Sequence, residues 1–255
     1  MPDRRGRIER RYSDVAVRAR ARDVIPGGKM RRRTGCALAA SAVVVLATVG
    51  MQSEGVGAPV ATCSGHRATI VGTARSDVLK GTKGPDVIAG LGGNDTIIGR
   101  RGGDIICGDD GNDTIRGGRG NDQITGSLGT DRLIGNRGHD ILRGGDADDL
   151  LKGGRRADRI SGGPGNDRLK GGKGSDRLSA GVGSDRLSGQ KGNDRLFGSA
   201  GLDTLVAGVG ADHLTGGPDN DALSAVDGVG DDSVRGSSGT DTCQADRGDF
   251  IRSCP

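Results

Sequence analysis

Aromatic side chains are almost absent from this chain of 255 residues, which has no Trp, one Tyr and two Phe. Only 32% of its residues are hydrophobic, whereas an ordinary globular domain of this length buries a thick core rich in Leu, Val and aromatics. The composition excludes such a domain. It also excludes collagen, because there are only seven prolines. The choice between disorder and an unusual fold therefore depends on the periodicity of the sequence.

Glutamate is nearly absent as well, since Glu9 and Glu54 are its only occurrences among 33 acidic residues. Glu favours helices, whereas Asp favours turns and short-armed coordination by oxygen. The charge is also uneven along the chain. Residues 1–33 carry about +8, which leaves about −4 for the remainder of a chain whose net charge is +4.

The one long apolar run covers residues 34–51 and follows the basic segment Met30–Arg33. A basic start, an apolar stretch and small residues after it are typical of a secretory signal peptide. We therefore interpret residues 30–61 as a signal peptide and linker, with an uncleaved membrane anchor as the alternative. Residues 1–29 are interpreted as a mis-annotated or disordered basic leader, with translation beginning at Met30. The alternative is a real basic cytoplasmic tail.

A nine-residue repeat organises the rest of the chain. Asp recurs every nine residues from Asp77 to Asp221 without a miss, and Leu or Ile stands two residues after each of them. Gly opens nearly every unit, and a second Gly usually lies two residues before the Asp. A two-residue insertion near Gly230 then shifts the phase, which gives Asp232 and Asp241. Such regular repetition indicates a repeat fold.

Each unit combines a Gly-rich hexapeptide with a three-residue extended segment. In residues 114–116, for example, Ile115 points one way and its polar neighbours point the other way, as in a strand. Such short strands need neighbours, and parallel stacking about 4.8 Å apart would align the aliphatic side chains in an inward ladder. The sequence therefore predicts a solenoid with a thin interior.

Two units carry a specific resemblance: residues 117–125 read GGRGNDQIT and residues 162–170 read GGPGNDRLK. They resemble the RTX, or haemolysin-type, calcium-binding nonapeptide repeat, whose pattern is G-G-x-G-x-D-x-U-x. The resemblance covers residues 72–224 continuously and residues 232–243 weakly. It implies an all-β fold, a right-handed parallel β-roll (a β-helix solenoid) with two repeats per coil and Ca²⁺ held in the turns.

Two repeats per coil would stack every second Asp on the same edge, in two columns. Carboxylates about 5 Å apart repel each other by about 1 kcal/mol even in water, and a dication between them reverses the sign of the interaction. Ca²⁺ accepts six to eight oxygens in flexible geometry, so Asp side chains and turn carbonyls suit it. We therefore expect several Ca²⁺ ions and folding coupled to their binding. The predicted metal ligands are Asp77, Asp86, Asp95, Asp104, Asp113, Asp122, Asp131, Asp140, Asp149, Asp167, Asp176, Asp185, Asp194, Asp203, Asp212 and Asp221.

Some turns depart from the pattern. Asp158 is left out of the predicted ligands because Arg155 and Arg156 precede it, and we expect Arg156 to neutralise its carboxylate. The Gly two residues before the Asp is replaced in four units, by Arg75, Ala147, Arg156 and Asp219. For any single Asp, the alternative is a structural turn residue that binds no metal.

Four cysteines remain once Cys36 leaves with the signal peptide, and an even number in an exported chain suggests disulfides. Position along the chain favours two bonds, Cys63–Cys107 and Cys243–Cys254, out of three connectivities, with four free thiols as the alternative. The chain has no C-x-x-C pair, which argues against a structural zinc site.

The remaining residues favour no catalytic site. The three His residues are scattered, and no Ser/His/Asp or Cys/His arrangement stands outside the repeat. Arg often follows the repeat Asp and is predicted to form an outward basic stripe, on a solvated sheet face that offsets the Asp columns. The low aromatic content argues against nucleic-acid binding. Regular outward Thr, which an ice-binding face would need, is also missing.

We therefore predict a secreted, extracellular, monomeric calcium-binding protein that is not an enzyme. Residues 62–224 would form an N-terminal cap and the β-roll, and residues 225–255 degenerate repeats and a disulfide-closed C-terminal cap. Its role is expected to be structural or adhesive, with a cell-surface or matrix partner. The alternative is a non-catalytic remnant or accessory module of a secreted RTX-type enzyme.

Overall fold

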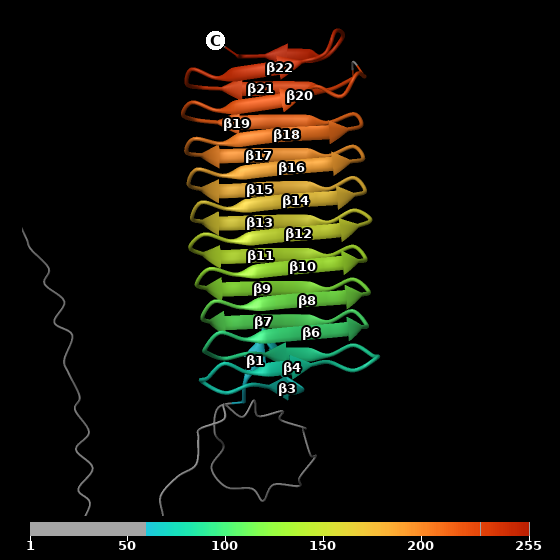
Figure 1. Cartoon of the computed structure of the whole chain (residues 1–255), viewed down its shortest axis with the longest axis vertical. Helices are drawn as coiled ribbons and strands as arrows, with labels where there is room; N and C mark the ends of the chain where they lie inside the picture. The colour runs from blue at the N-terminus through green and yellow to red at the C-terminus, as the bar shows by residue number, and fades with distance from the viewer. Residues whose placement is uncertain (1–59, 230, 255) are drawn as a thin grey trace, which may run out of the picture. The chain divides into compact units, whose positions relative to one another are not determined.

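The computed structural model describes residues 60–229 and 231–254 as a stack of β-strands (Figure 1). Helix is absent from these residues, so none of them forms a helix able to cross a membrane. The predicted leader and most of the predicted signal peptide lie outside the described residues. Apart from a small N-terminal hairpin, the strands form two parallel sheets of ten and eleven strands. The predicted all-β, parallel solenoid fold is confirmed.

The even sheet contains the even-numbered strands from β4 onward: β4 (Val78–Lys80), β6 (Thr96–Arg101), β8 (Thr114–Arg119), β10 (Arg132–Arg137), β12 (Leu150–Arg155), β14 (Arg168–Lys173), β16 (Arg186–Lys191), β18 (Thr204–Val209), β20 (Ala222–Ala225) and β22 (Thr242–Ala245). The odd sheet contains β3 (Ile70–Val71), β5 (Val87–Ala89), β7 (Ile105–Asp110), β9 (Gln123–Leu128), β11 (Ile141–Asp146), β13 (Arg159–Pro164), β15 (Arg177–Val182), β17 (Arg195–Ala200), β19 (His213–Gly217), β21 (Ser233–Ser237) and β23 (Phe250–Arg252). The chain alternates between the sheets, one repeat to each.

The register confirms that two repeats make one coil. Leu133 pairs with Ile115 on one side and with Leu151 on the other, so neighbours within a sheet are 18 residues apart. The same spacing holds in the odd sheet, where Leu178 pairs with Ile160. After the insertion near residue 230 the spacing widens to 20, as in the pairing of Leu214 with Val234. The insertion therefore lengthens a loop without breaking the stack.

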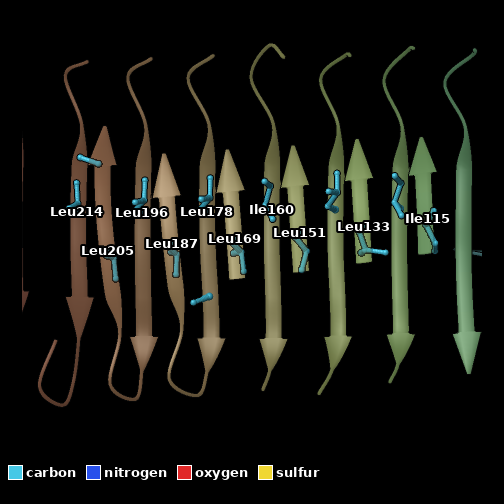
Figure 2. Packing of buried hydrophobic residues seen from close by; sticks show 14 of the residues in the cluster. Ile115, Leu133, Leu151, Ile160, Leu169, Leu178, Leu187, Leu196, Leu205 and Leu214 are labelled. Atoms are coloured by element: carbon cyan, nitrogen blue, oxygen red, sulfur yellow. The ribbon is translucent and has the colours of Figure 1, made fainter. Parts of the chain in front are cut away.

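The core is a double ladder of single aliphatic side chains, one from each repeat. The Leu and Ile residues two positions after the repeat Asp are at most 4% exposed, from Leu79 to Leu223. Figure 2 shows these side chains from both sheets lying between them. Because each repeat contributes only one such residue, the interior is as thin as the composition predicted.

Most strands are six residues long rather than the three expected, because each strand continues through the opening glycines of the next unit. The second residue of that unit has positive φ, for example 126° at Gly118 and 78° at Asn136. β3 and β4 stop early, and the corresponding residues there are Thr73 and Thr82, which do not have positive φ. A β-branched residue strongly disfavours the left-handed conformation, which accounts for β3 and β4. β5 also stops after three residues although Leu91 has φ of 79°, so this explanation does not extend to it.

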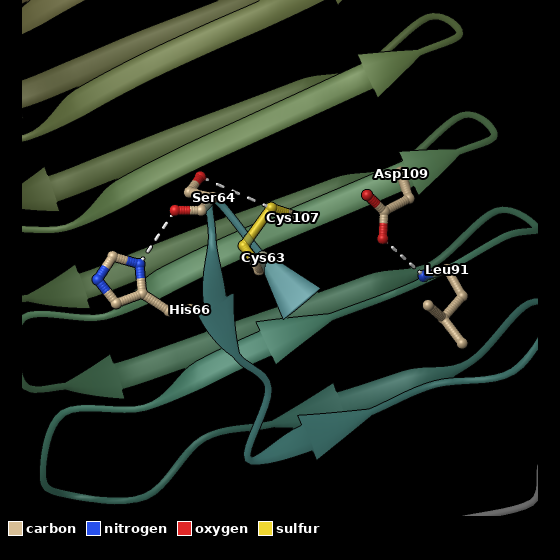
Figure 3. The surroundings of a disulfide bond; sticks show 6 residues. All are labelled: Cys63, Ser64, His66, Leu91, Cys107 and Asp109. Carbon is tan, nitrogen blue, oxygen red and sulfur yellow. Dashed lines mark hydrogen bonds between the residues drawn. A yellow bond between two sulfur atoms is a disulfide. The ribbon is translucent and has the colours of Figure 1, made fainter. Parts of the chain in front are cut away.

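A hairpin of β1 (Thr62–Cys63) and β2 (His66–Arg67) lies against the outer face of the odd sheet near its start. A disulfide joins Cys63 to Cys107 of β7, and both side chains are buried beside Ala89 (Figure 3). A second disulfide joins Cys243 to Cys254 at the other end. Both predicted bonds are thus present in the structure.

Candidate metal centre

The repeat aspartates stack in two columns, as predicted. From Asp95 onward, each side chain points inward at the start of a strand, where its Oδ1 accepts a hydrogen bond from the backbone N–H of the Asp one coil earlier. The N–H of Asp77 donates to Asp95 at 2.8 Å, and the N–H of Asp122 donates to Asp140 at 2.9 Å. The Asp77 column comprises Asp77, Asp95, Asp113, Asp131, Asp149, Asp167, Asp185, Asp203, Asp221 and Asp241. The Asp86 column comprises Asp86, Asp104, Asp122, Asp140, Asp158, Asp176, Asp194, Asp212 and Asp232.

The second oxygen, Oδ2, is the feature of the columns that needs an explanation. It is buried and has no hydrogen-bond partner in Asp95, Asp104, Asp113, Asp122, Asp131, Asp140, Asp149, Asp158, Asp167, Asp176, Asp185, Asp194, Asp203, Asp212, Asp221, Asp232 and Asp241. A buried oxygen without a donor costs roughly 1–3 kcal/mol, and more when it carries charge. Either a proton or a bound cation would satisfy these atoms.

The glycine that opens most units makes room for this oxygen, whereas Ala180 and Ala207 open the units of Asp185 and Asp212. A Cβ added to Gly90 would contact both Oδ2 of Asp95 and the carbonyl oxygen of Gly108. The same double contact recurs at Gly144, with Asp149 and Gly162. A carboxylate oxygen and a carbonyl oxygen from the next coil therefore face the same side of these two glycines. At both positions a Cβ would displace the carboxylate.

Burial raises the pKa of most column carboxyl groups above the ordinary value of 3.8. Loss of solvation is the largest cause, the backbone N–H bond opposes it, and neighbouring carboxylates of the same column generally add to it. The pKa is raised to about 8 for Asp158, about 7 for Asp122, Asp131, Asp149, Asp194 and Asp203, and about 6 for Asp95, Asp140, Asp167, Asp176 and Asp232. Without a cation, the groups whose pKa is about 7 or 8 are therefore partly protonated at neutral pH.

Two of the predicted ligands differ from the rest. Oδ2 of Asp77 accepts hydrogen bonds from the backbone N–H and the hydroxyl of Thr73, at 2.6 and 2.8 Å. Oδ2 of Asp86 accepts the equivalent bonds from Thr82, at 2.6 and 3.1 Å. Both carboxylates are satisfied within the protein, so they have less need of a cation. The threonines in the second position of these units are the sequence signal for the difference.

Asp158, in contrast, belongs with the other column residues, and the expectation that Arg156 neutralises it was wrong. Asp158 is 2% exposed, its Oδ2 has no partner, and its pKa is raised by burial and by Asp140 and Asp176. Arg156 is exposed, in a left-handed conformation with φ of 78°. Its side chain points to solvent while the carboxylate points to the interior.

Asp232 and Asp241 extend the columns beyond the residues predicted as ligands. The N–H of Asp212 donates to Asp232 at 2.7 Å, and the N–H of Asp221 donates to Asp241 at 3.0 Å. Their Oδ2 atoms are buried without a partner, like the others. The sequence showed that the repeat continues at these two residues after the phase shift. Only the strand pairing across the inserted loop places them in the columns.

Within residues 60–229 and 231–254, no three His, Cys, Asp or Glu side chains converge on a point that could hold a metal. The column aspartates are spaced by one coil, and one oxygen of each is bonded to backbone. A calcium site here must therefore include backbone carbonyls. In the turn before Asp113, the N–H of Asn112 is satisfied by Oδ1 of Asn94 at 2.8 Å, while the carbonyls of Gly111 and Asn112 accept no hydrogen bond from described residues. Carboxylate and carbonyl oxygens together fit Ca²⁺.

Comparison with protein families gives a match over most of the chain. A model of the RTX calcium-binding nonapeptide repeat, four copies long, matches residues 71–106, 108–142, 143–178, 171–205, 197–228 and 224–249. These segments cover more than half of the sequence and agree with the repeats described above. Comparison with curated proteins found no match.

Proposed function

The chain belongs to the RTX calcium-binding nonapeptide repeat family, whose repeats bind several Ca²⁺ ions, and we propose that the unpartnered Oδ2 atoms of its two columns are the calcium ligands. The observation that carries this proposal is the set of 17 buried carboxylate oxygens without a donor. The ligands are then the predicted aspartates from Asp95 onward, together with Asp158, Asp232 and Asp241. Asp77 and Asp86 form weaker sites, because threonines already occupy their second oxygens.

The residues of the chain prepare the columns for a cation. The backbone N–H of the preceding coil fixes one carboxylate oxygen and so directs the other to the side of the opening glycine. The missing Cβ of that glycine leaves the space free. When bound, Ca²⁺ supplies the positive charge that these stacked oxygens lack, so that ionised carboxylates become stable in the interior. Calcium binding and folding are then coupled, because the columns exist only in the folded roll.

Outside the cell, such a roll would serve as a calcium-dependent structural or adhesive module without catalytic activity. Two disulfides support an oxidising, extracellular setting. RTX repeats are typical of secreted proteins. The described part of the chain consists of the stacked repeats and a hairpin of four strand residues, which favours a non-catalytic role.

Titration of chelator-treated full chain with Ca²⁺, followed by far-UV circular dichroism and calorimetry, tests the proposal. We expect a coil-to-β transition with Ca²⁺ that Mg²⁺ does not reproduce, because Mg²⁺ demands tight octahedral geometry. Asp140→Asn removes one column carboxylate, and Asp148→Asn removes an exposed one from a neighbouring turn. The first variant should bind at least one Ca²⁺ fewer, and the second should match the unmodified chain. An unchanged calcium stoichiometry in Asp140→Asn would contradict the assignment.

A further inference from the structure

The two edges of the roll, where the turns lie, differ in charge. Six successive even strands, β6 to β16, each end in an exposed basic residue, and we call this set the basic row. Its members pair in register from each strand to the next, one strand spacing or about 4.8 Å apart. They are Arg101, Arg119, Arg137, Arg155, Lys173 and Lys191.

A second group of cations lies on the far side of the same turns. Arg159, Arg177 and Arg195 are the first residues of β13, β15 and β17, pair in register, and are exposed. The arginines after the repeat Asp therefore do not form one stripe, as the sequence suggested. Those at the start of odd strands lie at the basic edge, whereas Arg132, Arg168 and Arg186 lie at the opposite edge, at the start of even strands.

No carboxylate on the surface balances the basic row. The six strands that carry it contain no Asp or Glu, and the only acidic residues in the turns that follow them are the buried members of the Asp86 column. At the opposite edge, the residues equivalent to the basic row are neutral or acidic, as with Asp110, Val182 and Ala200. The repeat can therefore fold without a basic residue at this position. A row of like charges at this spacing is repulsive, and the equivalent residues at the opposite edge avoid that repulsion although a column of buried carboxylates lies there as well.

Two shallow hollows lie along this edge, one on each side of the turns. The first, of about 440 Å³, is lined by Arg119, Arg137, Arg155 and Arg156. The second, of about 690 Å³, is lined by the second group of arginines together with His139, Asn193 and the nearly buried Asp158 and Asp176. The cations thus surround surface that a ligand lying along the edge could occupy.

We propose that this edge binds a linear acidic polysaccharide, extended along the stack, with its carboxylate or sulfate groups on the basic row. Arginine offers a planar fork that binds an anionic group through two hydrogen bonds, and four of the six residues are Arg. The inference rests on the proposed adhesive role and names the chemistry of its partner.

The spacing favours a polysaccharide over a nucleic acid. The basic row offers one cation about every 4.8 Å along the stack, whereas each strand of duplex DNA carries one phosphate per about 3.4 Å of helix axis and winds around that axis instead of following a row. A polysaccharide with one acidic group on each sugar ring has its charges further apart along its axis than duplex DNA has. The six strands also lack any aromatic side chain on which a base could stack.

The test compares two triple variants that remove the same charge. Arg119→Gln/Arg137→Gln/Arg155→Gln lowers the charge of the basic row, and Arg132→Gln/Arg168→Gln/Arg186→Gln removes three exposed arginines from the opposite edge. Binding of the full chain in millimolar Ca²⁺ is measured with heparin and hyaluronan oligosaccharides of equal length, which separate sulfate from carboxylate recognition. Neutral dextran and duplex DNA serve as controls. The basic residues 1–33 are identical in all variants, so their contribution cancels in the ratio.

We expect the first triple to weaken oligosaccharide binding about tenfold and the second less than about threefold, because charge pairs act at short range. Equal losses in both triples, or tighter binding of DNA than of either oligosaccharide, would overturn the inference. The single variants Arg137→Gln and Arg168→Gln repeat the comparison with minimal change to the roll. Circular dichroism of the same samples separates the two proposals. A calcium-induced β signal without a difference between the triples overturns only this inference, whereas a β signal at pH 7.5 that needs no Ca²⁺ overturns the calcium proposal alone.

Discussion

Acidification should fold the roll in the absence of calcium. A carboxyl group with a higher pKa in the folded chain than in the unfolded chain gains a proton on folding. Eleven column aspartates have a pKa raised to between about 6 and about 8, from the ordinary 3.8. The stability of the calcium-free roll is therefore highest below about pH 4 and falls as the pH rises through 6 to 8.

The magnitude follows from the number of protons taken up. Each group that is protonated in the folded chain and ionised in the unfolded chain changes the free energy of unfolding by about 1.4 kcal/mol per pH unit. Protonation of one carboxyl group removes its repulsion of the neighbouring carboxylates in the column, so fewer groups take up a proton than are present. If only three respond, a change from pH 6 to pH 5 stabilises the roll by about 4 kcal/mol. This is comparable with the whole stability of a small domain.

The assay is far-UV circular dichroism of the full chain in chelator, between pH 7.5 and pH 4.5. We expect the β signal to rise as the pH falls. Calcium should produce the same signal at pH 7.5, and calorimetry in buffers of different ionisation enthalpy should detect proton release on calcium binding near pH 6.5. A signal that is independent of pH without calcium, together with binding that releases no protons, would refute the role assigned to the buried carboxyl groups.

Two further changes test the backbone and the disulfide. Gly120→Ala places a Cβ against the carbonyl of Gly102 at a residue with φ of 129°, so the calcium concentration needed for folding should rise by several-fold. Gly84→Ala is the control, because the nearest atom to its Cβ is 3.9 Å away and φ is not positive, and it should leave that concentration unchanged. Equal behaviour of the two variants would contradict this explanation. Replacing both Cys63 and Cys107 with Ser opens a loop that spans 44 residues and should lower the free energy of unfolding in denaturant titrations by up to about 4 kcal/mol. The hairpin should also become sensitive to protease. An unchanged unfolding midpoint would show that the disulfide contributes nothing to stability.

The strict spacing of Asp and of the aliphatic residue two positions later was enough to predict the fold. A period of nine with one inward residue in each unit is compatible only with a thin stack of coils. Two repeats per coil then place Asp122 next to Asp104 in one column. Both disulfides also followed from position, because each joins segments near one end of the array. These features depend on local pattern and repetition, which a sequence displays directly.

Other properties of the site depend on which atoms meet between coils. The sequence shows Thr73 and Thr82 but not that their hydroxyl groups reach the carboxylates of Asp77 and Asp86. It shows Arg156 near Asp158 but not that one side chain points outward and the other inward.

By itself, the sequence determined the repeat and the parallel stack, and it singled out the residue type of the proposed calcium ligands, because these follow from a period repeated along the chain. Only the tertiary structure decided which carboxylate oxygens lack a donor and which cations share an edge. Those properties depend on contacts between residues 18 or 20 positions apart and on the alternation of the chain between two sheets. That alternation separates Arg168 from Arg177, although both directly follow a repeat Asp.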